Sequence, residues 1–138
     1  MGYLIESFLQ KIEVEISAGN VAVLDSIPQQ VIKSNELTDY TIVAANLSMK
    51  DQIGTISNFG HFYLQISYAI PGDRIAVFDE NVGNISTDKK NNFLINTSHP
   101  PNRFGSVSSY TQDITVITEL PPTATGDLIV TIYYFKNF

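Results

Sequence analysis

Apolar and polar residues alternate along much of the chain. Residues 12–17 read Ile-Glu-Val-Glu-Ile-Ser, and from residue 62 to residue 70 every second position is a large apolar or aromatic residue. A period of two places successive side chains on opposite faces of a strand, whereas a helix repeats every three to four residues. Both segments are therefore predicted to be strands with one face in a core and the other toward water.

Short strands of this kind, separated by turn residues, account for most of the chain. The residues Pro71-Gly72-Asp73 form a typical turn, because Pro fixes φ and Gly accepts a left-handed conformation. No long helix alternates with the strands, which excludes a parallel α/β sheet. The predicted fold class is all-β, an antiparallel β-sandwich or jelly roll of about eight strands, in a single domain over residues 1–138. Besides the two segments above, strands are expected at 21–25, 30–32, 38–49, 75–78, 92–96, 111–119 and 127–136.

Three segments are expected to lie outside regular strands. Residues 18–20 read as a turn, and the polar stretches 79–92 and 97–109 read as long loops. Loops of this length tend to be functional or to make contacts with another part of the structure or another molecule. Residues 1–11 have apolar positions that suit a helical face, but an N-terminal arm or strand leading into residues 12–17 is the favoured interpretation.

The last predicted strand is apolar on both faces. Leu128, Val130, Ile132 and Tyr134 share one face, and Ile129, Thr131, Tyr133 and Phe135 share the other. A strand in a half-solvated antiparallel sheet should alternate more cleanly. It is either a central strand whose outer face is covered by a loop or by the N-terminal arm, or a strand whose second face packs against another copy of the chain. We favour the second interpretation, since exposed apolar patches mark interaction sites. The expected subunit-interface residues are Leu4, Phe8, Ile129, Tyr133, Phe135 and Phe138.

Charge is scarce and mostly negative. The 138 residues include 8 Lys or Arg and 14 Asp or Glu, for a net charge of −6. Nucleic-acid binding requires clustered basic residues, so it is not expected. Only 16% of the residues are charged, against about 25% in typical domains. A surface with so few charges is often partly covered by another molecule.

No catalytic or metal-binding motif is present. The chain has no Cys, which excludes disulfides and thiolate sites. The two histidines, His61 and His99, lack partners at metal-ligand spacing. The acidic loop around Asp79 fails the EF-hand pattern and is interpreted as solvated. We therefore expect no enzyme and no cofactor.

Glycan recognition is the alternative to assembly. Jelly rolls are common lectin scaffolds. In the absence of Trp, the aromatic platform for a sugar would have to come from Tyr40, Tyr63, Tyr68, Tyr110, Tyr133 or Phe104. Phe104 and Tyr110, which flank a Gly/Ser-rich loop, are the best-placed candidate ligand residues.

The N-terminal residues carry no basic segment before an apolar run, so no secretory signal is expected. The apolar runs are a few residues long, short of the ~20 that a membrane-spanning helix needs. Synthesis in a cytoplasm without a signal peptide, and no membrane span, are the resulting expectations.

Two segments resemble small all-β virion structural proteins of bacteriophages. Residues 21–31, VAVLDSIPQQV, match a strand pattern V-x-x-L-[ND]-[ST]-x-P-x-x-[VIL] typical of their N-terminal region, and residues 126–134, GDLIVTIYY, are similar to the turn and final strand that often end them. The resemblance covers residues 12–34 and 126–136, about a quarter of the chain.

This resemblance implies a capsid-associated, penton, decoration or tail protein in the virion of a phage, made in the host cytoplasm. Its partners would be other copies of itself and other virion proteins, and no catalytic residue is implied. The alternatives are a receptor- or glycan-binding β-sandwich module and, third, a small jelly-roll enzyme that depends on an Asp or Glu.

Overall fold

The computed structural model describes residues 10–33, 39–66, 68, 70, 73–78, 84–85, 91–93 and 113–137. Over these residues the protein is all-β, as predicted, with eleven strands in three antiparallel sheets. Its helices, within the same residues, are the single-turn α1 (Ala18–Val21) and the 3-10 turn η2 (Lys50–Gln52). The strands are β1 (Gln10–Ile16), β2 (Gln29–Ile32), β3 (Asp39–Met49), β4 (Ile56–Ser57), β5 (Phe62–Ile66), β6 (Asp73–Val77), β7 (Asn84–Ile85), β8 (Asn91–Phe93), β9 (Ile114–Thr118), β10 (Thr123–Ala124) and β11 (Leu128–Asn137).

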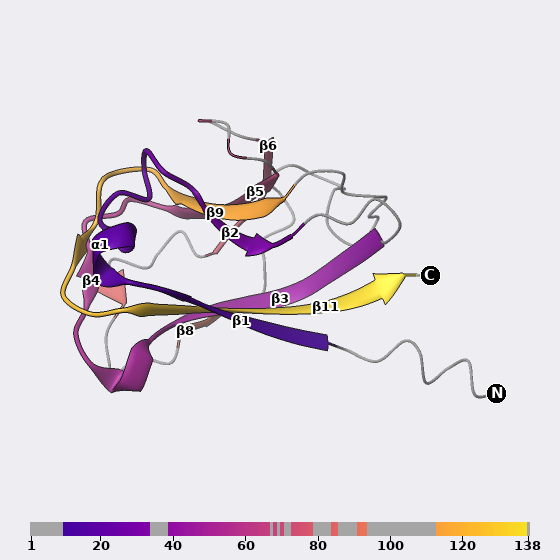
Figure 1. Cartoon of the computed structure of the whole chain (residues 1–138), viewed down its shortest axis with the longest axis horizontal. Coiled ribbons are helices and arrows are strands. Elements are labelled where there is room, and N and C mark those ends of the chain that lie inside the picture. The colour runs from indigo at the N-terminus through magenta and orange to yellow at the C-terminus, as the bar shows by residue number, and fades with distance from the viewer. Residues whose placement is uncertain are drawn as a thin grey trace.

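Two four-stranded sheets form the two layers of the structure (Figure 1). We call them sheet I, with the order β1-β11-β3-β8, and sheet II, with the order β2-β9-β5-β6. A small sheet of the two-residue strands β10, β4 and β7 lies at one end, near α1.

The strands pair in a nested order along the chain. β1 pairs with β11, β2 with β9, β3 with β8, and β5 with β6, all antiparallel. The short elements follow the same order, since β4 pairs with β7, and α1 contacts β10. The second half of the chain therefore retraces the first half in reverse, from the β5–β6 turn out to the two ends.

The core lies between the inner faces of sheets I and II. Three phenylalanines contribute rings that pack edge to face: the centroids of Phe59 and Phe62 are 4.9 Å apart, and those of Phe62 and Phe78 are 6.2 Å apart. Such contacts add to the stabilisation from burial alone. The fully buried aliphatic side chains of the two sheets include Ile16, Leu47, Leu128, Val130 and Ile132 from sheet I and Leu64, Ile114 and Val116 from sheet II.

Sheet II is buried on both faces at its centre. Every residue of β9 is buried, including Thr115 and Ile117 on the side opposite the core. On the paired strand β5, Gln65 has no exposed surface, and Tyr63 packs with Ile117 in a second apolar cluster. The outer side of sheet II is therefore buried at these positions.

The strand predicted at 21–25 is wrong, because the chain forms α1 and a series of turns there. The Ser17 hydroxyl accepts a hydrogen bond of 3.3 Å from the Asn20 backbone N–H and caps the helix. Val21 and Leu24, three residues apart, are both fully buried, which is helical spacing. Alternation over so few residues did not distinguish a strand from a helical turn.

Other boundaries also differ from the prediction. The turn expected at 18–20 is part of α1, and the strand expected over 62–70 ends at Ile66. The loop expected at 79–92 includes β7 and the start of β8. The loop expected at 97–109 lies outside the described residues.

A core truncation should be far more costly than a surface one. Leu64 has no exposed side-chain surface, whereas Ile53 is 63% exposed. We expect Leu64→Ala to lower the free energy of unfolding by about 2–5 kcal/mol and Ile53→Ala to change it by less than about 0.5 kcal/mol. Urea denaturation followed by circular dichroism measures both, and equal losses would contradict this account of the core.

Gly54 and Gly126 allow the loop before β4 and the loop before β11 to come close together. A Cβ on Gly126 would lie against the carbonyl oxygen of Ile53, and Gly54 has a φ of +84° beside Thr125. We expect Gly126→Ala to destabilise the fold by about 1–3 kcal/mol. Gly19 is the matched control, because a Cβ there meets nothing within 4 Å and helical Ala is preferred to Gly. A Gly126→Ala variant as stable as Gly19→Ala in urea would refute the close approach.

Candidate interaction surfaces

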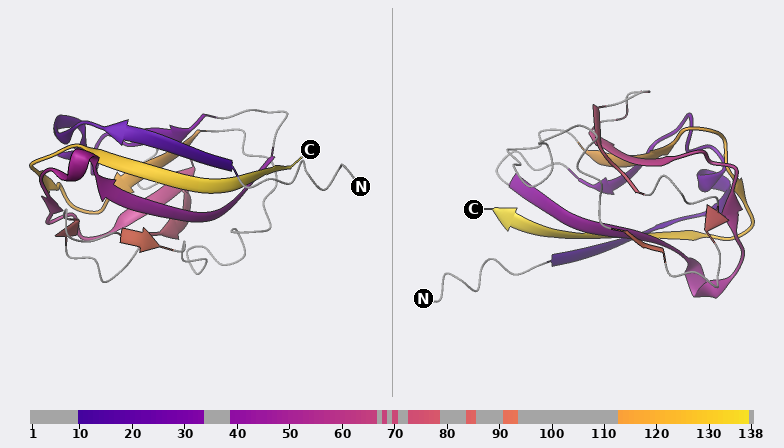
Figure 2. Two further views of the ribbon diagram at one scale, coloured as in Figure 1. Left: turned by 90° about the horizontal axis from the view of Figure 1, so that it is seen from below. Right: turned by 180° about the vertical axis from the view of Figure 1, so that it is seen from behind.

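The outer face of sheet I is centred on β11, which lies between β1 and β3. Since Leu128, Val130 and Ile132 point into the core, alternation places Ile129, Thr131 and Tyr133 on the outer face. The view from below in Figure 2 shows β1, β11 and β3 side by side, with β1 at the border.

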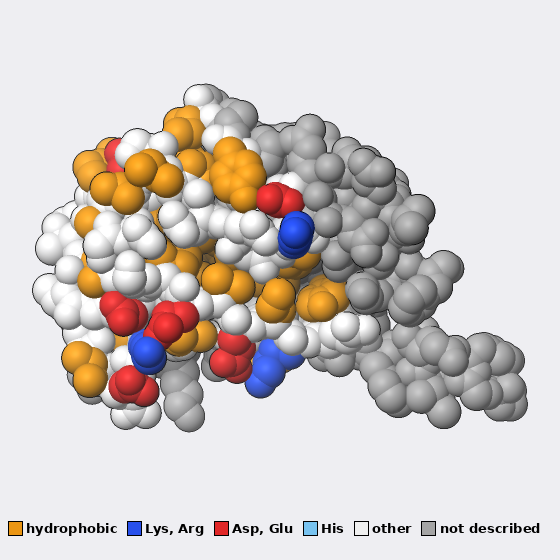
Figure 3. Space-filling model, viewed as in Figure 1, with side chains coloured by type: hydrophobic (Ala, Val, Ile, Leu, Met, Phe, Trp, Pro, Cys, Tyr) orange, Lys and Arg blue, Asp and Glu red, His pale blue; other side chains and the backbone are white. Residues whose placement is uncertain are grey.

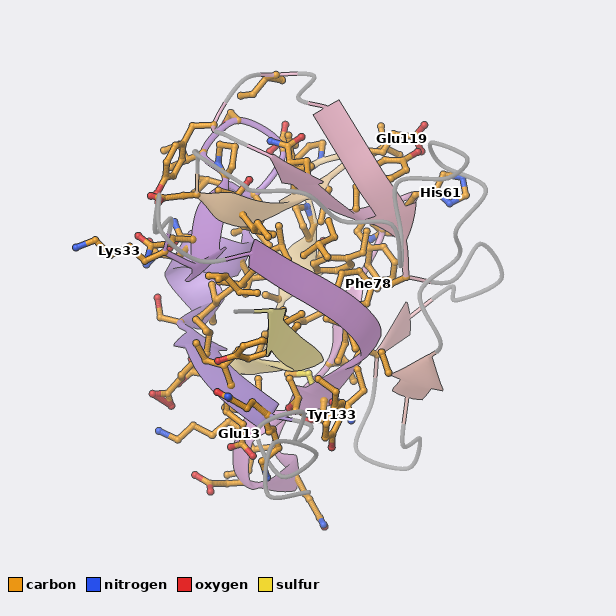
Figure 4. All side chains as sticks on the ribbon, turned by 90° about the vertical axis from the view of Figure 1, so that its right-hand side faces the viewer. Glu13, Lys33, His61, Phe78, Glu119 and Tyr133 are labelled. Carbon is orange, nitrogen blue, oxygen red and sulfur yellow. The ribbon has the colours of Figure 1, made fainter. Side chains whose placement is uncertain are left out.

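On this face the residues of β11 lie between charged residues of β1 and the residues Ala44, Asn46 and Ser48 of β3. Ile129 and Tyr133 are half-buried, and Thr131 between them is buried. Directly across on β1, Glu15 is opposite Ile129 and Lys11 is opposite Tyr133. Figure 4 shows Tyr133 and Glu13 on the same lower side of the molecule. Ile129 and Tyr133 thus keep part of their side-chain surface accessible in the middle of this face.

Two ion pairs mark the charged border. The Lys11 ammonium lies 3.2 Å from the Glu13 carboxylate, and Lys50 pairs with Glu15. The hydrogen bond and charge of Glu15 raise the pKa of Lys50. The four side chains are 43–54% exposed, so these pairs contribute little to stability. Along β1 these pairs involve one positive side chain, Lys11, followed by two negative ones, Glu13 and Glu15.

The expected interface residues fall into three groups. Ile129 and Tyr133 lie on the outer face of sheet I. Phe135 lies in β11 opposite Thr41, and its side chain is outside the described part. Leu4, Phe8 and Phe138, and the candidate ligand residues Phe104 and Tyr110, also lie outside the described residues. β11 is an interior strand, as the alternative interpretation expected, but Ile129 and Tyr133 are not fully covered.

A second surface gathers residues from three separate segments around Tyr68. The Tyr68 hydroxyl donates a 2.8 Å hydrogen bond to the Asp113 carboxylate, and the Gln30 side-chain oxygen lies 3.4 Å away. Tyr68 is 49% exposed, and Ile70, two residues later, is 54% exposed. An accessible aromatic ring with a neighbouring carboxylate and amide is a suitable platform for a polar ring-shaped ligand.

Exposed apolar side chains occur elsewhere as well. Hydrophobic side chains gather in the upper part of the face shown in Figure 3. Apart from Tyr68 and Ile70, the large apolar side chains that are mostly exposed within the described residues are Ile27, Ile53 and Leu120. All three belong to connections between strands, not to a sheet face.

His61 is the one described residue with a buried side-chain nitrogen or oxygen that lacks a hydrogen-bond partner. It precedes β5, where its carbonyl oxygen accepts a hydrogen bond from the Glu119 N–H, and its ring lies 5.8 Å from that of Tyr63. Figure 4 shows His61 and Glu119 near each other at the rim. No group of three or more His, Asp or Glu that would hold a metal occurs among the described residues.

No protein-family model matches the sequence, and no curated protein matches it. Among the described residues, no helix has the length and apolar character needed to cross a membrane.

Titration of Tyr68 tests the geometry of the second surface. Desolvation and, next, the hydrogen bond to Asp113 raise the pKa of Tyr68 above its ordinary value of about 10. The folded state thus holds this proton more tightly than the unfolded state. The resulting stabilisation is fully present below pH about 10 and is lost as the pH rises through the higher folded-state pKa.

We expect Asp113→Asn to lower the pKa of Tyr68, measured from the ¹³Cζ chemical shift, because the carboxylate that raises it is removed. Glu13→Gln, which changes a carboxylate on the outer face of sheet I, should leave it unchanged. A Tyr68 pKa that does not respond to Asp113→Asn would show that the two groups are not in contact.

Proposed function

We propose that this chain is a non-enzymatic structural subunit of a bacteriophage particle, a jelly roll that associates through the outer face of sheet I. The observation that carries the proposal is the nested pairing of the eight strands that are three or more residues long.

The nested pairing supports the jelly-roll assignment. A jelly roll is an eight-stranded antiparallel hairpin rolled up so that its successive pairs alternate between two sheets. Here the outermost pair, β1–β11, and the third pair, β3–β8, belong to sheet I, whereas β2–β9 and β5–β6 belong to sheet II. The alternation of pairs between the sheets is complete.

The structural role has separate support. Jelly rolls serve as capsid subunits, lectins and cupins, so the fold alone does not select a function. The sequence resemblance to phage virion proteins favours the first of these. The outer face of sheet I favours it too, since it keeps Ile129 and the aromatic residue Tyr133 partly accessible beside a charged border, and aromatic residues are enriched in subunit interfaces.

Self-association should depend on the centre of this face. We expect Tyr133→Glu to weaken self-association by about 30-fold, which corresponds to about 2 kcal/mol and is typical of a central aromatic residue. Analytical ultracentrifugation over a range of concentrations measures the effect, and circular dichroism verifies the fold. The control is Leu120→Glu, which adds the same charge at an exposed apolar position outside the sheet.

Equal effects of the two substitutions would contradict the proposed contact. A wild-type chain that stays monomeric at all concentrations, and that does not bind purified phage particles, would contradict the structural role.

Glycan binding is the second candidate, and the surface around Tyr68 favours it. The exposed ring, the Asp113 carboxylate and the Gln30 amide together supply a stacking surface and hydrogen-bonding groups. If this function is correct, the wild type should bind on a glycan array, Tyr68→Ala should lose that binding, and Tyr133→Ala should retain it. Binding that persists in Tyr68→Ala would exclude this site.

A further inference from the structure

We infer that β1 is a self-complementary edge, at which two copies of this chain join their β1 strands antiparallel about a twofold axis at Ile12. The two copies of sheet I would then form one continuous sheet. The inference goes beyond the proposed function by naming a second contact, and it rests on the same tendency of the chain to self-associate.

The first observation is the free side of β1. In the part of the chain that the structure describes, β1 is hydrogen-bonded to β11 and to no other strand. It also contacts β2, but β2 belongs to sheet II and lies in the other layer of the structure (Figure 1). An edge of this kind offers unpaired backbone N–H and C=O groups to another strand.

The second observation is incomplete burial along this edge. Ile12 and Val14 point toward the core but are only half-buried. Their direct partners on β11, Ile132 and Val130, have no exposed surface. A second β1 strand would cover the remaining apolar surface of Ile12 and Val14, which favours association.

The third observation, the order of charges, selects the register. Directly opposite residues in an antiparallel pair lie on the same face of the sheet, whereas neighbouring residues of one strand point to opposite faces. A twofold axis between two residues would place neighbours opposite each other, so the axis must pass through a residue position. An axis at Ile12 places Lys11 of one copy opposite Glu13 of the other, twice. An axis at Lys11 would place two lysines opposite each other, and an axis at Glu13 would oppose two glutamates. Like charges directly opposite destabilise a pair, so the axis at Ile12 is favoured.

The ion pair within each copy is compatible with this register. Lys11 and Glu13 are two residues apart on the same face of β1 and lie 3.2 Å from each other. Across the twofold axis, the four side chains form a square in which every neighbour has the opposite charge. Glu15 does not take part in these charge contacts between the two copies, because it pairs with Lys50 of its own chain.

Charge reversal tests the register directly. In sedimentation equilibrium, Lys11→Glu and Glu13→Lys should each dimerise at least about tenfold more weakly than the wild type, because each creates two like-charge contacts. An equimolar mixture of the two variants should form heterodimers of nearly wild-type affinity, and the double variant should dimerise again. Glu15→Lys, which lies outside the charge square, is the control and should dimerise like the wild type.

Cross-linking provides a readout that does not depend on charge. The chain has no Cys, so single cysteines can be placed freely. Opposite Cα atoms in an antiparallel pair are about 4.5–5.5 Å apart, which a disulfide spans. A mixture of Lys11→Cys and Glu13→Cys should therefore oxidise to a covalent heterodimer faster than either variant alone.

Three results would overturn the inference. The first is a wild-type chain that is monomeric in sedimentation equilibrium. The second is a mixture of Lys11→Glu and Glu13→Lys that associates no better than either variant alone. The third is a mixture of Lys11→Cys and Glu13→Cys that cross-links no faster than either variant alone. The outer face is tested separately: if Tyr133→Glu abolishes association while Lys11→Glu and Glu13→Lys do not, the proposed function stands and the β1 contact is wrong. The opposite pattern would retain the β1 contact and remove the proposed contact through β11.

Discussion

The structure depends on antiparallel hydrogen bonding between the two halves of the chain. The outermost pair of strands, β1 and β11, places Ile16 opposite Leu128, although the two residues are far apart in sequence. Each four-stranded sheet contains strands from both halves of the chain, so neither sheet can form from one half alone. Asp127 reinforces this closure, because its carboxylate accepts a 2.9 Å hydrogen bond from the Ala18 N–H and its carbonyl oxygen accepts one of the same length from Lys50. The core, the small end sheet and the outer faces all follow from this pairing.

β11 links the core to the surface that we assign to assembly. Its inner residues fill the space between the sheets, and on its outer face Ile129 and Tyr133 stay half-buried in the middle of sheet I. β1 adds Lys11, Glu13 and Glu15 to the border and, within the described residues, has one side that is hydrogen-bonded to no other strand. Sheet I therefore contains both the outer face and the edge to which we assign contacts between copies.

Much of the fold could be predicted from the sequence, because β1 and β5 alternate between apolar and polar residues and β3 and β11 are rich in the β-branched residues that favour strands. The strands β4, β7 and β10 could not, since two residues are too few to show a period. The helix α1 was missed because Val21 and Val23 imitated strand alternation. The surface around Tyr68 could not be predicted from the sequence either. Tyr68 and Asp113 are 45 residues apart and meet only because β5 pairs with β9. For β11, composition identified a strand that is apolar on both faces but not how far its outer face is covered.

The nested pairing is tested most directly by nuclear Overhauser effects between backbone protons in solution. The account predicts cross-strand contacts between Val14 and Val130 in sheet I and between Gln30 and Thr115 in sheet II, which are partners in the register. Contacts between β1 and β2 as hydrogen-bonded neighbours, in the manner of a sequential meander, would contradict it.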